Sequence, residues 1–180
     1  MTIIVEDGTI VADANSWVTA LQADDYFTLE HPNATDWEGF DDDTKEASLR
    51  FAVKLLDTMD WYGYRSDPSN QELSWPRNLV YDEDRQRYFQ PNEIPTFLKD
   101  SQFELAVALA REDRTLVGES AAGAGLKRAK VDVLELEWFE NSAKIVERAK
   151  PLIPNIVCRF IEPYTESGCG RGINVKLFRV

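Results

Sequence analysis

The segment between residues 61 and 92 places the strongest constraint on the fold, because it is long and has little regular periodicity. It contains two aromatic and basic runs, Trp61-Tyr62-Gly63-Tyr64-Arg65 and Leu73-Ser74-Trp75-Pro76-Arg77. Trp75 precedes a proline, so its backbone is shifted toward β or polyproline conformations and away from the α-helix. A connection of about thirty residues inside a compact domain is more often functional than accidental. We therefore expect residues 61–92 to form a long central loop with a role of its own.

The tryptophans and arginines of this loop allow two interpretations. Bases stack on aromatic rings and guanidinium groups pair with phosphates, so the composition is typical of nucleic-acid binding. Alternatively, buried indoles pin the loop to the core while the arginines pair locally. We favour the second interpretation, in which the loop anchors are Trp61, Arg65, Trp75, Pro76 and Arg77.

The charge balance argues against general nucleic-acid binding. The chain has 32 acidic and 20 basic residues, a net charge of -12, whereas affinity for nucleic acid depends mainly on phosphate contacts from a basic surface. The charge is also uneven, because residues 1–60 carry a net charge of -11 and residues 141–180 a net charge of +4. This polarity suits head-to-tail docking of copies or docking on a charged partner. An acidic surface that only keeps the protein soluble is the open alternative.

The apolar spacing predicts a mainly α fold, a small helical bundle within one domain. The expected helices cover about residues 20–30, 43–60, 95–116 and 142–161, the last interrupted near Pro151 and Pro154. A capping box of Thr19 and Gln22 marks the start of the first helix, and the acidic run Asp41-Asp42-Asp43 favours the start of the second. The second helix has an apolar stripe typical of a core-facing helix: Leu49, Ala52, Val53, Leu56 and Met59.

Extended structure is expected outside these helices. Residues 2–5 read as a short strand. A β-hairpin arm is expected at 127–138, because the alternation of apolar residues changes phase at Asp132-Val133. We therefore predict a helical domain at 1–162 that carries this hairpin arm, followed by an extended docking tail at 163–180.

The tail has the pattern of a strand that adds to a partner. Glycines at 168, 170 and 172 supply a hinge, and apolar residues then alternate with polar ones. An alternative is that the tail pairs with residues 2–5 of its own chain. The residues expected to dock on a partner are Arg171, Ile173, Val175, Lys176, Leu177, Phe178 and Arg179.

The residues give no basis for an enzyme, a cofactor or a metal site. The lone histidine, His31, has no cluster of ligands around it, and Cys158 and Cys169 lack metal-ligand spacing. Acidic pairs such as Asp24-Asp25 have no accompanying nucleophile or base. The chain contains no apolar run of about 18 residues that would span a membrane. Its first residues lack the features of a signal peptide, so we expect an intracellular protein.

Further short motifs lie between residues 5 and 106, each weak alone but fairly specific in combination, and they carry a resemblance that covers about residues 1–155. They are Val5-Glu6-Asp7-Gly8-Thr9, Ala14-Asn15-Ser16-Trp17-Val18, Ala23-Asp24 with Tyr26-Phe27, Trp61 with Gly63 and Arg65, Gln71, Leu73, Trp75-Pro76-Arg77 with Tyr81-Asp82, and Ile94-Pro95 with Lys99-Asp100 and Glu104-Leu105-Ala106. With these motifs the chain resembles a tailed-phage family of head–tail adaptors, often labelled DnaT-like single-stranded-DNA-binding proteins.

The chain departs from this family at two points. Members usually have glycine two residues after Trp-Pro-Arg, where this chain has Leu79. The Asp-Gly turn expected after Tyr81-Asp82 is replaced by Glu83-Asp84-Arg85, so we expect a longer and differently folded loop there. The resemblance does not extend into the tail beyond about residue 160.

The resemblance implies a structural head–tail connector subunit that forms a ring, expected to be dodecameric, under the portal. Its implied partners are the portal protein, neighbouring copies of itself and a downstream neck or tail protein, in the virion neck and, during assembly, in the host cytoplasm. A negatively charged channel lets packaged double-stranded DNA slide without specific binding. The alternative is a DnaT-like replication protein that binds single-stranded DNA through Trp61, Arg65, Trp75 and Arg77.

Overall fold

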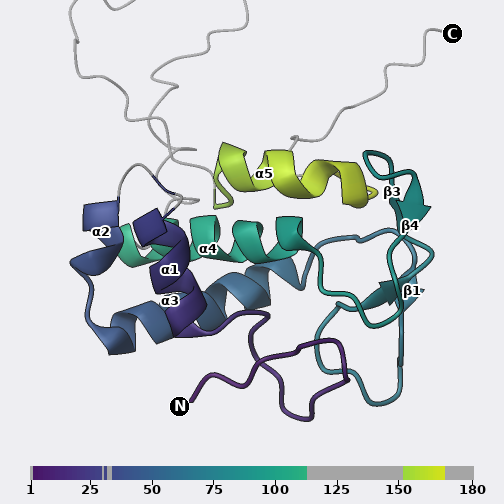
Figure 1. Cartoon of the computed structure of the whole chain (residues 1–180), viewed down its shortest axis with the longest axis horizontal. Coiled ribbons are helices and arrows are strands. Elements are labelled where there is room, and N and C mark those ends of the chain that lie inside the picture. Colours follow the sequence, from purple (N-terminus) through teal and green to yellow (C-terminus); the bar gives the residue numbers. More distant parts are fainter. Residues whose placement is uncertain (1, 30, 32–33, 113–151, 169–180) are drawn as a thin grey trace, which may run out of the picture. The chain divides into compact units, whose positions relative to one another are not determined.

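The computed structural model describes residues 2–29, 31, 34–112 and 152–168 (Figure 1). The chain divides into two units, one of Met1–Glu112 and Ile153–Val180 and the other of Asp113–Leu152. All the helices and strands that are described belong to the first unit. The expected hairpin arm at 127–138 and the docking residues at 171–179 lie outside the described residues.

Helices dominate the described part of the chain, as the sequence predicts. They are α1 (Ala20–Leu29), α2 (Ala34–Glu38), α3 (Asp42–Leu56), α4 (Thr96–Arg111), α5 (Asn155–Ile161) and the short 3-10 helix η2 (Glu162–Tyr164). Helix α4 lies between α3 and α5 and contacts both, while α1 contacts α2 and α3 (Figure 1). Its central place explains why α4 is buried along most of its length, from Leu98 to Ala108.

The predicted helix starts are confirmed by their hydrogen bonds. The backbone N–H of Gln22 donates to Thr19 Oγ1 at 3.0 Å, and the backbone N–H of Thr19 donates to Gln22 Oε1 at 2.8 Å. This reciprocal pair is a capping box at the start of α1. At α3, the backbone N–H of Thr44 donates to the carboxylate of Asp41, the N-cap residue, at 2.8 Å.

The apolar stripe of α3 faces the core, and α3 and α4 pack together as expected. Of the five predicted stripe residues, Leu49, Ala52, Val53 and Leu56 are buried, whereas Met59 lies beyond the end of α3 and is half-buried. Gln102, fully buried on α4, adds a polar tie, because its side-chain amide donates to Ser16 Oγ at 2.7 Å and to the backbone oxygen of Leu49 at 3.2 Å. Buried polar groups need such partners, and this one joins the N-terminal segment to both helices.

Several helix boundaries differ from the prediction. Helix α3 ends at Leu56 rather than near residue 60, because Asp57 becomes its C-cap and turns its carboxylate toward later residues. Helix α2 was not predicted at all. Among the described residues, the 142–161 prediction is represented by α5, which begins after Pro154.

The extended elements also differ from the prediction. Residues 2–5 form a single bridge, Val5 to Ser16, in place of the expected strand. The long central loop is not wholly irregular, because it contains two antiparallel pairs of short strands. These are β1 (Tyr64–Arg65) with β2 (Arg77–Asn78), and β3 (Tyr81–Asp82) with β4 (Arg87–Tyr88).

Gly63, just before β1, is required by the close approach of β2. Its φ is +69°, and a Cβ atom there would lie 2.1 Å from the backbone oxygen of Asn78. Only glycine adopts this conformation without strain and leaves room for the neighbouring strand.

The predicted domain boundary after residue 162 falls inside packed structure. The ring of Tyr164 stacks on Phe97 with centroids 4.0 Å apart, and Thr165 forms a bridge with Trp61. Residues 163–168 are therefore part of the helical unit rather than the beginning of a separate tail.

Candidate functional site

The two loop tryptophans lie side by side in the core. Trp75 is fully buried and Trp61 is 4% exposed, and their rings meet edge to face with centroids 5.8 Å apart. The Trp61 indole N–H donates to the backbone oxygen of Leu56, the last residue of α3, at 3.0 Å. Trp75 also packs edge to face on Phe89 and Phe97. Both indoles therefore join the irregular segment to the helices, and neither face is open for stacking on a base.

Arg77, on β2, is bonded entirely to backbone. Its guanidinium donates to four carbonyl oxygens: Tyr62 at 2.8 Å, Ser74 at 3.2 Å, Trp61 at 3.2 Å and Gly63 at 2.7 Å. Since an irregular backbone has no regular ladder to satisfy its carbonyls, one planar guanidinium with five donors is well suited to the task. The side chain acts as a clamp between two stretches of the loop.

Arg65 and Asp57 complete the bracing of the loop. Arg65, paired with Arg77 across the strands, donates to the backbone oxygen of Gln71 at 3.3 Å and lies 3.9 Å from the Asp57 carboxylate. Asp57 also accepts a hydrogen bond from the backbone N–H of Ser74. The buried amide of Gln71 donates to the backbone oxygens of Leu73 and Pro76. The Trp75–Pro76 peptide bond inside this turn is cis.

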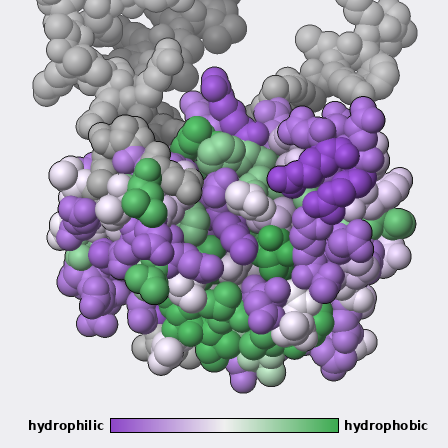
Figure 2. Space-filling view, in the orientation of Figure 1, coloured by the Kyte–Doolittle hydropathy of each residue, from purple (hydrophilic) through white to green (hydrophobic). Residues whose placement is uncertain are grey.

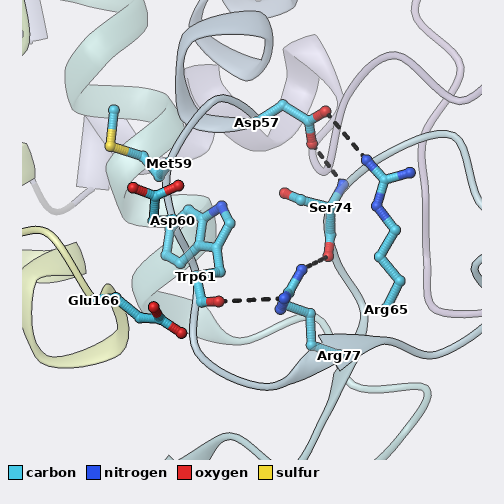
Figure 3. A pocket seen from close by; sticks show the side chains of 8 residues that line it. All are labelled: Asp57, Met59, Asp60, Trp61, Arg65, Ser74, Arg77 and Glu166. Atoms are coloured by element: carbon cyan, nitrogen blue, oxygen red, sulfur yellow. Dashed lines mark hydrogen bonds and ion pairs between the residues drawn. The ribbon is translucent and has the colours of Figure 1, made fainter.

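These groups border a polar pocket of about 310 Å³ (Figure 3). Asp57 and Arg65 face each other on one side, and Ser74 and Arg77 lie next to them. Asp60 and Glu166 form the opposite side, and Glu166 comes from the turn after η2. The lining residues are Asp57, Met59, Asp60, Trp61, Arg65, Ser74, Arg77 and Glu166.

Hydrogen bonds between distant parts of the chain hold the acidic side of this pocket. The backbone N–H of Glu166 donates to the backbone oxygen of Asp60 at 2.7 Å, and Ser167 Oγ donates to the Asp60 carboxylate at 2.6 Å. Burial lowers the pKa of Arg77, and the nearby charge of Arg65 lowers that pKa further, whereas Asp57 and Glu166 act in the opposite direction. The two acids thus help to keep a half-buried guanidinium charged.

The structure brings all the predicted loop anchors together but adds residues that the sequence did not single out. Trp61, Arg65 and Arg77 line the pocket, Trp75 packs against Trp61 in the core, and the backbone oxygen of Pro76 accepts a hydrogen bond from Gln71. Asp57, Asp60, Ser74 and Glu166 were missed. No local signal marks them, because their proximity depends on contacts between residues about 20 to 100 positions apart in the chain. The predicted docking residues between Arg171 and Arg179 lie outside the described residues.

A second feature missed from the sequence is a set of exposed aromatic side chains on the strands. Tyr81 and Tyr88 face each other across β3 and β4 with ring centroids 5.2 Å apart, and both are exposed. Tyr62 and Tyr64 are exposed as well. In the same region Leu79 adopts a φ of +60° and is 62% exposed, at the position where glycine is usual in the family that the chain resembles.

Within 2–29, 31, 34–112 and 152–168, no group of three or more His, Cys, Asp or Glu side chains is arranged to hold a metal ion. None of the helices in these ranges is both long and apolar enough to cross a bilayer.

The described residues thus form a mainly helical domain in which an aromatic and arginine-rich segment is fastened internally to the helices. The sequence model of the family described as "Putative DnaT-like ssDNA binding protein" matches residues 1–180, and the chain belongs to this family. No curated protein matches the chain, and no solved structure matches it.

Proposed function

We propose that this chain is a structural head–tail connector subunit of a tailed bacteriophage. In this role it forms a ring, of twelve copies by the family resemblance, that extends the DNA channel under the portal. Its partners are the portal protein, neighbouring copies and a downstream neck or tail protein. It works in the virion neck after assembly in the host cytoplasm, and the role includes no catalytic step.

The observation that carries this proposal is the internal use of the loop's aromatic and arginine side chains. Trp61 and Trp75 are buried, Arg77 donates to four backbone carbonyls and Arg65 is held by Gln71 and Asp57. These are the groups that a nucleic-acid interface would need on its surface. Hydrophilic side chains cover most of the face in Figure 2, and the chain carries a net charge of -12. An acidic conduit repels the duplex, so DNA slides through rather than being gripped.

The direct test is a mass measurement of the purified full chain with and without portal particles. We expect a defined multiple of the chain mass to attach to each portal ring. A chain that stays unattached at micromolar concentration would contradict the connector role.

A second measurement separates this role from DNA binding. In a chain with Trp138→Phe, tryptophan emission should be shielded from a soluble quencher and unchanged by single-stranded DNA at physiological salt, because the four remaining tryptophans are buried. DNA-dependent quenching that weakens steeply with salt would instead indicate phosphate contacts and base stacking.

Single-stranded-DNA binding is the second candidate, favoured by the family description and by the exposed tyrosines of the strands. In this case Tyr81 and Tyr88 stack on bases in place of the buried tryptophans. Oligonucleotide titrations of Tyr88→Ala and Tyr88→Phe distinguish the two roles, because phenylalanine keeps the stacking face and alanine removes it. A loss of affinity in Tyr88→Ala alone would support DNA binding, whereas no measurable affinity in the unmodified chain would exclude it.

A further inference from the structure

The Arg77 donors of the polar pocket are engaged by backbone, whereas Arg65 makes one hydrogen bond and faces Asp57. Four backbone carbonyl oxygens accept hydrogen bonds from the Arg77 guanidinium. The Arg65 guanidinium donates to the backbone oxygen of Gln71 and forms an ion pair with Asp57. A guanidinium that is committed to backbone carbonyls has little capacity left for a bound anion. Arg77 therefore shapes the pocket, and the carboxylates of Asp57, Asp60 and Glu166 disfavour a phosphate or carboxylate ligand.

The acceptors of the pocket are open. Among the described residues the Glu166 carboxylate accepts no hydrogen bond and interacts with Arg77 only through its charge, and Asp60 receives a side-chain hydrogen bond from Ser167 on one oxygen. Ser74 is 3% exposed, and its Oγ has no hydrogen-bond partner within the part of the chain that the structure describes. Figure 3 shows this hydroxyl directed toward the side of the pocket where Trp61 and Asp60 lie. A buried hydroxyl without a partner is costly, so a ligand with N–H donors would complete this site.

The charges lead to the same ligand class. Three carboxylates (Asp57, Asp60 and Glu166) and two guanidiniums (Arg65 and Arg77) line the pocket, which leaves one negative charge in excess. A single cation with several N–H donors balances that charge and bonds to the open acceptors. Lysine and arginine side chains have this chemistry, and a volume of about 310 Å³ suits a side chain rather than a folded surface.

We propose that this pocket binds a lysine or arginine side chain from residues 171–179 of a second copy of the chain. This inference rests on the proposed function, since it specifies the contact between neighbouring subunits. The sequence of each copy carries both halves: the pocket, and the basic residues Arg171, Lys176 and Arg179 after the glycines at 168, 170 and 172. Two different surfaces that meet in this way make a heterologous interface, which closes into a ring when the rotation permits.

The first test measures binding of a labelled peptide of residues 170–180 by fluorescence anisotropy. The recipient is the full chain with Arg171→Gln, Lys176→Gln and Arg179→Gln, so its own basic residues do not compete. We expect saturable binding that weakens at least about tenfold when Glu166→Arg is added, because a charge-assisted contact is replaced by repulsion. Glu38→Arg, which reverses another exposed carboxylate, on α2, is the matched control and should bind as before.

Two further arms keep this test decisive. Ser74→Ala should weaken binding of the peptide. It should not lower the melting temperature of the unbound chain, because the Ser74 hydroxyl has no hydrogen-bond partner among the described residues. A peptide with glutamine at positions 171, 176 and 179 should not bind. Equal binding of the peptide to the Glu166→Arg recipient, or no saturable binding at all, would overturn the site.

Native mass spectrometry of mixed variants tests whether the contact joins two copies. Chains with Glu166→Arg retain the basic residues, and chains with the three glutamine changes retain the pocket, so the mixture should form one-to-one dimers that neither variant forms alone. Peptide binding without such dimers would show that the pocket takes the basic residues of its own chain, and would overturn the assignment to a second copy. Portal attachment of the unmodified chain is measured separately. Its failure with peptide binding intact would defeat the connector role and leave this site standing.

Discussion

The helical body and the irregular segment 61–92 both bury tryptophans completely, yet they are held together by different interactions. Around Trp17 and Trp37, helices α1, α3 and α4 satisfy most of their own backbone groups and pack their apolar faces, with the buried Gln102 as an added polar contact. Around Trp61 and Trp75, few backbone groups pair with one another in strands. Side chains perform that task instead, chiefly those of Arg77, Gln71 and Asp57, because buried backbone carbonyls and N–H groups must find partners.

This difference shows why composition is a poor guide to the role of an arginine. Trp and Arg clustered in a loop are typical of nucleic-acid recognition. In this chain Arg77 has four backbone oxygens within reach, and the indoles supply the apolar surface that fixes the loop to the helices. The backbone around an arginine therefore decides whether its donors face inward or toward a ligand.

The largest expected loss of stability comes from a substitution in the irregular segment 61–92. Trp75→Ala should lower the free energy of unfolding by about 3–5 kcal/mol, because it removes a fully buried ring that contacts Trp61, Phe89 and Phe97. Urea denaturation measures this loss. Tyr88→Ala removes an exposed ring in the same segment and should change the free energy of unfolding by less than about 0.5 kcal/mol. Similar values for the two variants would mean that the segment is not anchored to the core.

The matching change in the helical body is Leu56→Ala at the end of α3. Leu56 is fully buried, so the expected loss is about 2–5 kcal/mol by the same measurement. Lys54→Ala, exposed on the same helix, is the control. A loss below about 0.5 kcal/mol for Leu56→Ala would place the apolar stripe in solvent.

A smaller loss of stability should show whether Arg77 stabilises the loop through its hydrogen bonds or through its charge. Arg77→Lys keeps the positive charge but cannot reproduce the planar set of donors, so we expect a loss of about 1–3 kcal/mol as carbonyl oxygens lose their partners. Arg85→Lys, at an exposed position with one ion pair to Asp82, should have almost no effect. An Arg77→Lys chain as stable as the unmodified one would assign the role of Arg77 to its charge alone.

The smallest expected effect is an increase in the free energy of unfolding. Leu79 has a φ of +60° and an exposed side chain, so Leu79→Gly relieves backbone strain and loses little packing. We expect stability to rise by up to about 1 kcal/mol, measured as a shift in the denaturation midpoint. Leu21→Gly, at an exposed position inside α1, should instead cost about 1 kcal/mol. A loss in both variants would mean that Leu79 makes a contact outside the described residues.

Interactions within four residues along the chain were determined by the sequence alone. The capping box of Thr19 and Gln22, the acidic run that begins α3 and the buried stripe from Leu49 to Leu56 are all local, and the structure has them where the sequence predicts. The sequence also indicated that Trp61 and Trp75 would anchor the loop, because large indoles beside a proline-broken segment favour burial.

Only the tertiary structure decided the rest. Helix α3 stops at Leu56 because Asp57 is drawn to Ser74 and Arg65, and the pocket exists because Asp60 meets Ser167, more than 100 residues away. The short strands form because Gly63 lets β2 approach and Arg77 binds the carbonyls of residues 61–63. No local pattern encodes such pairs, since each depends on helices α3, α4 and α5 first packing together and bringing distant segments into hydrogen-bonding range.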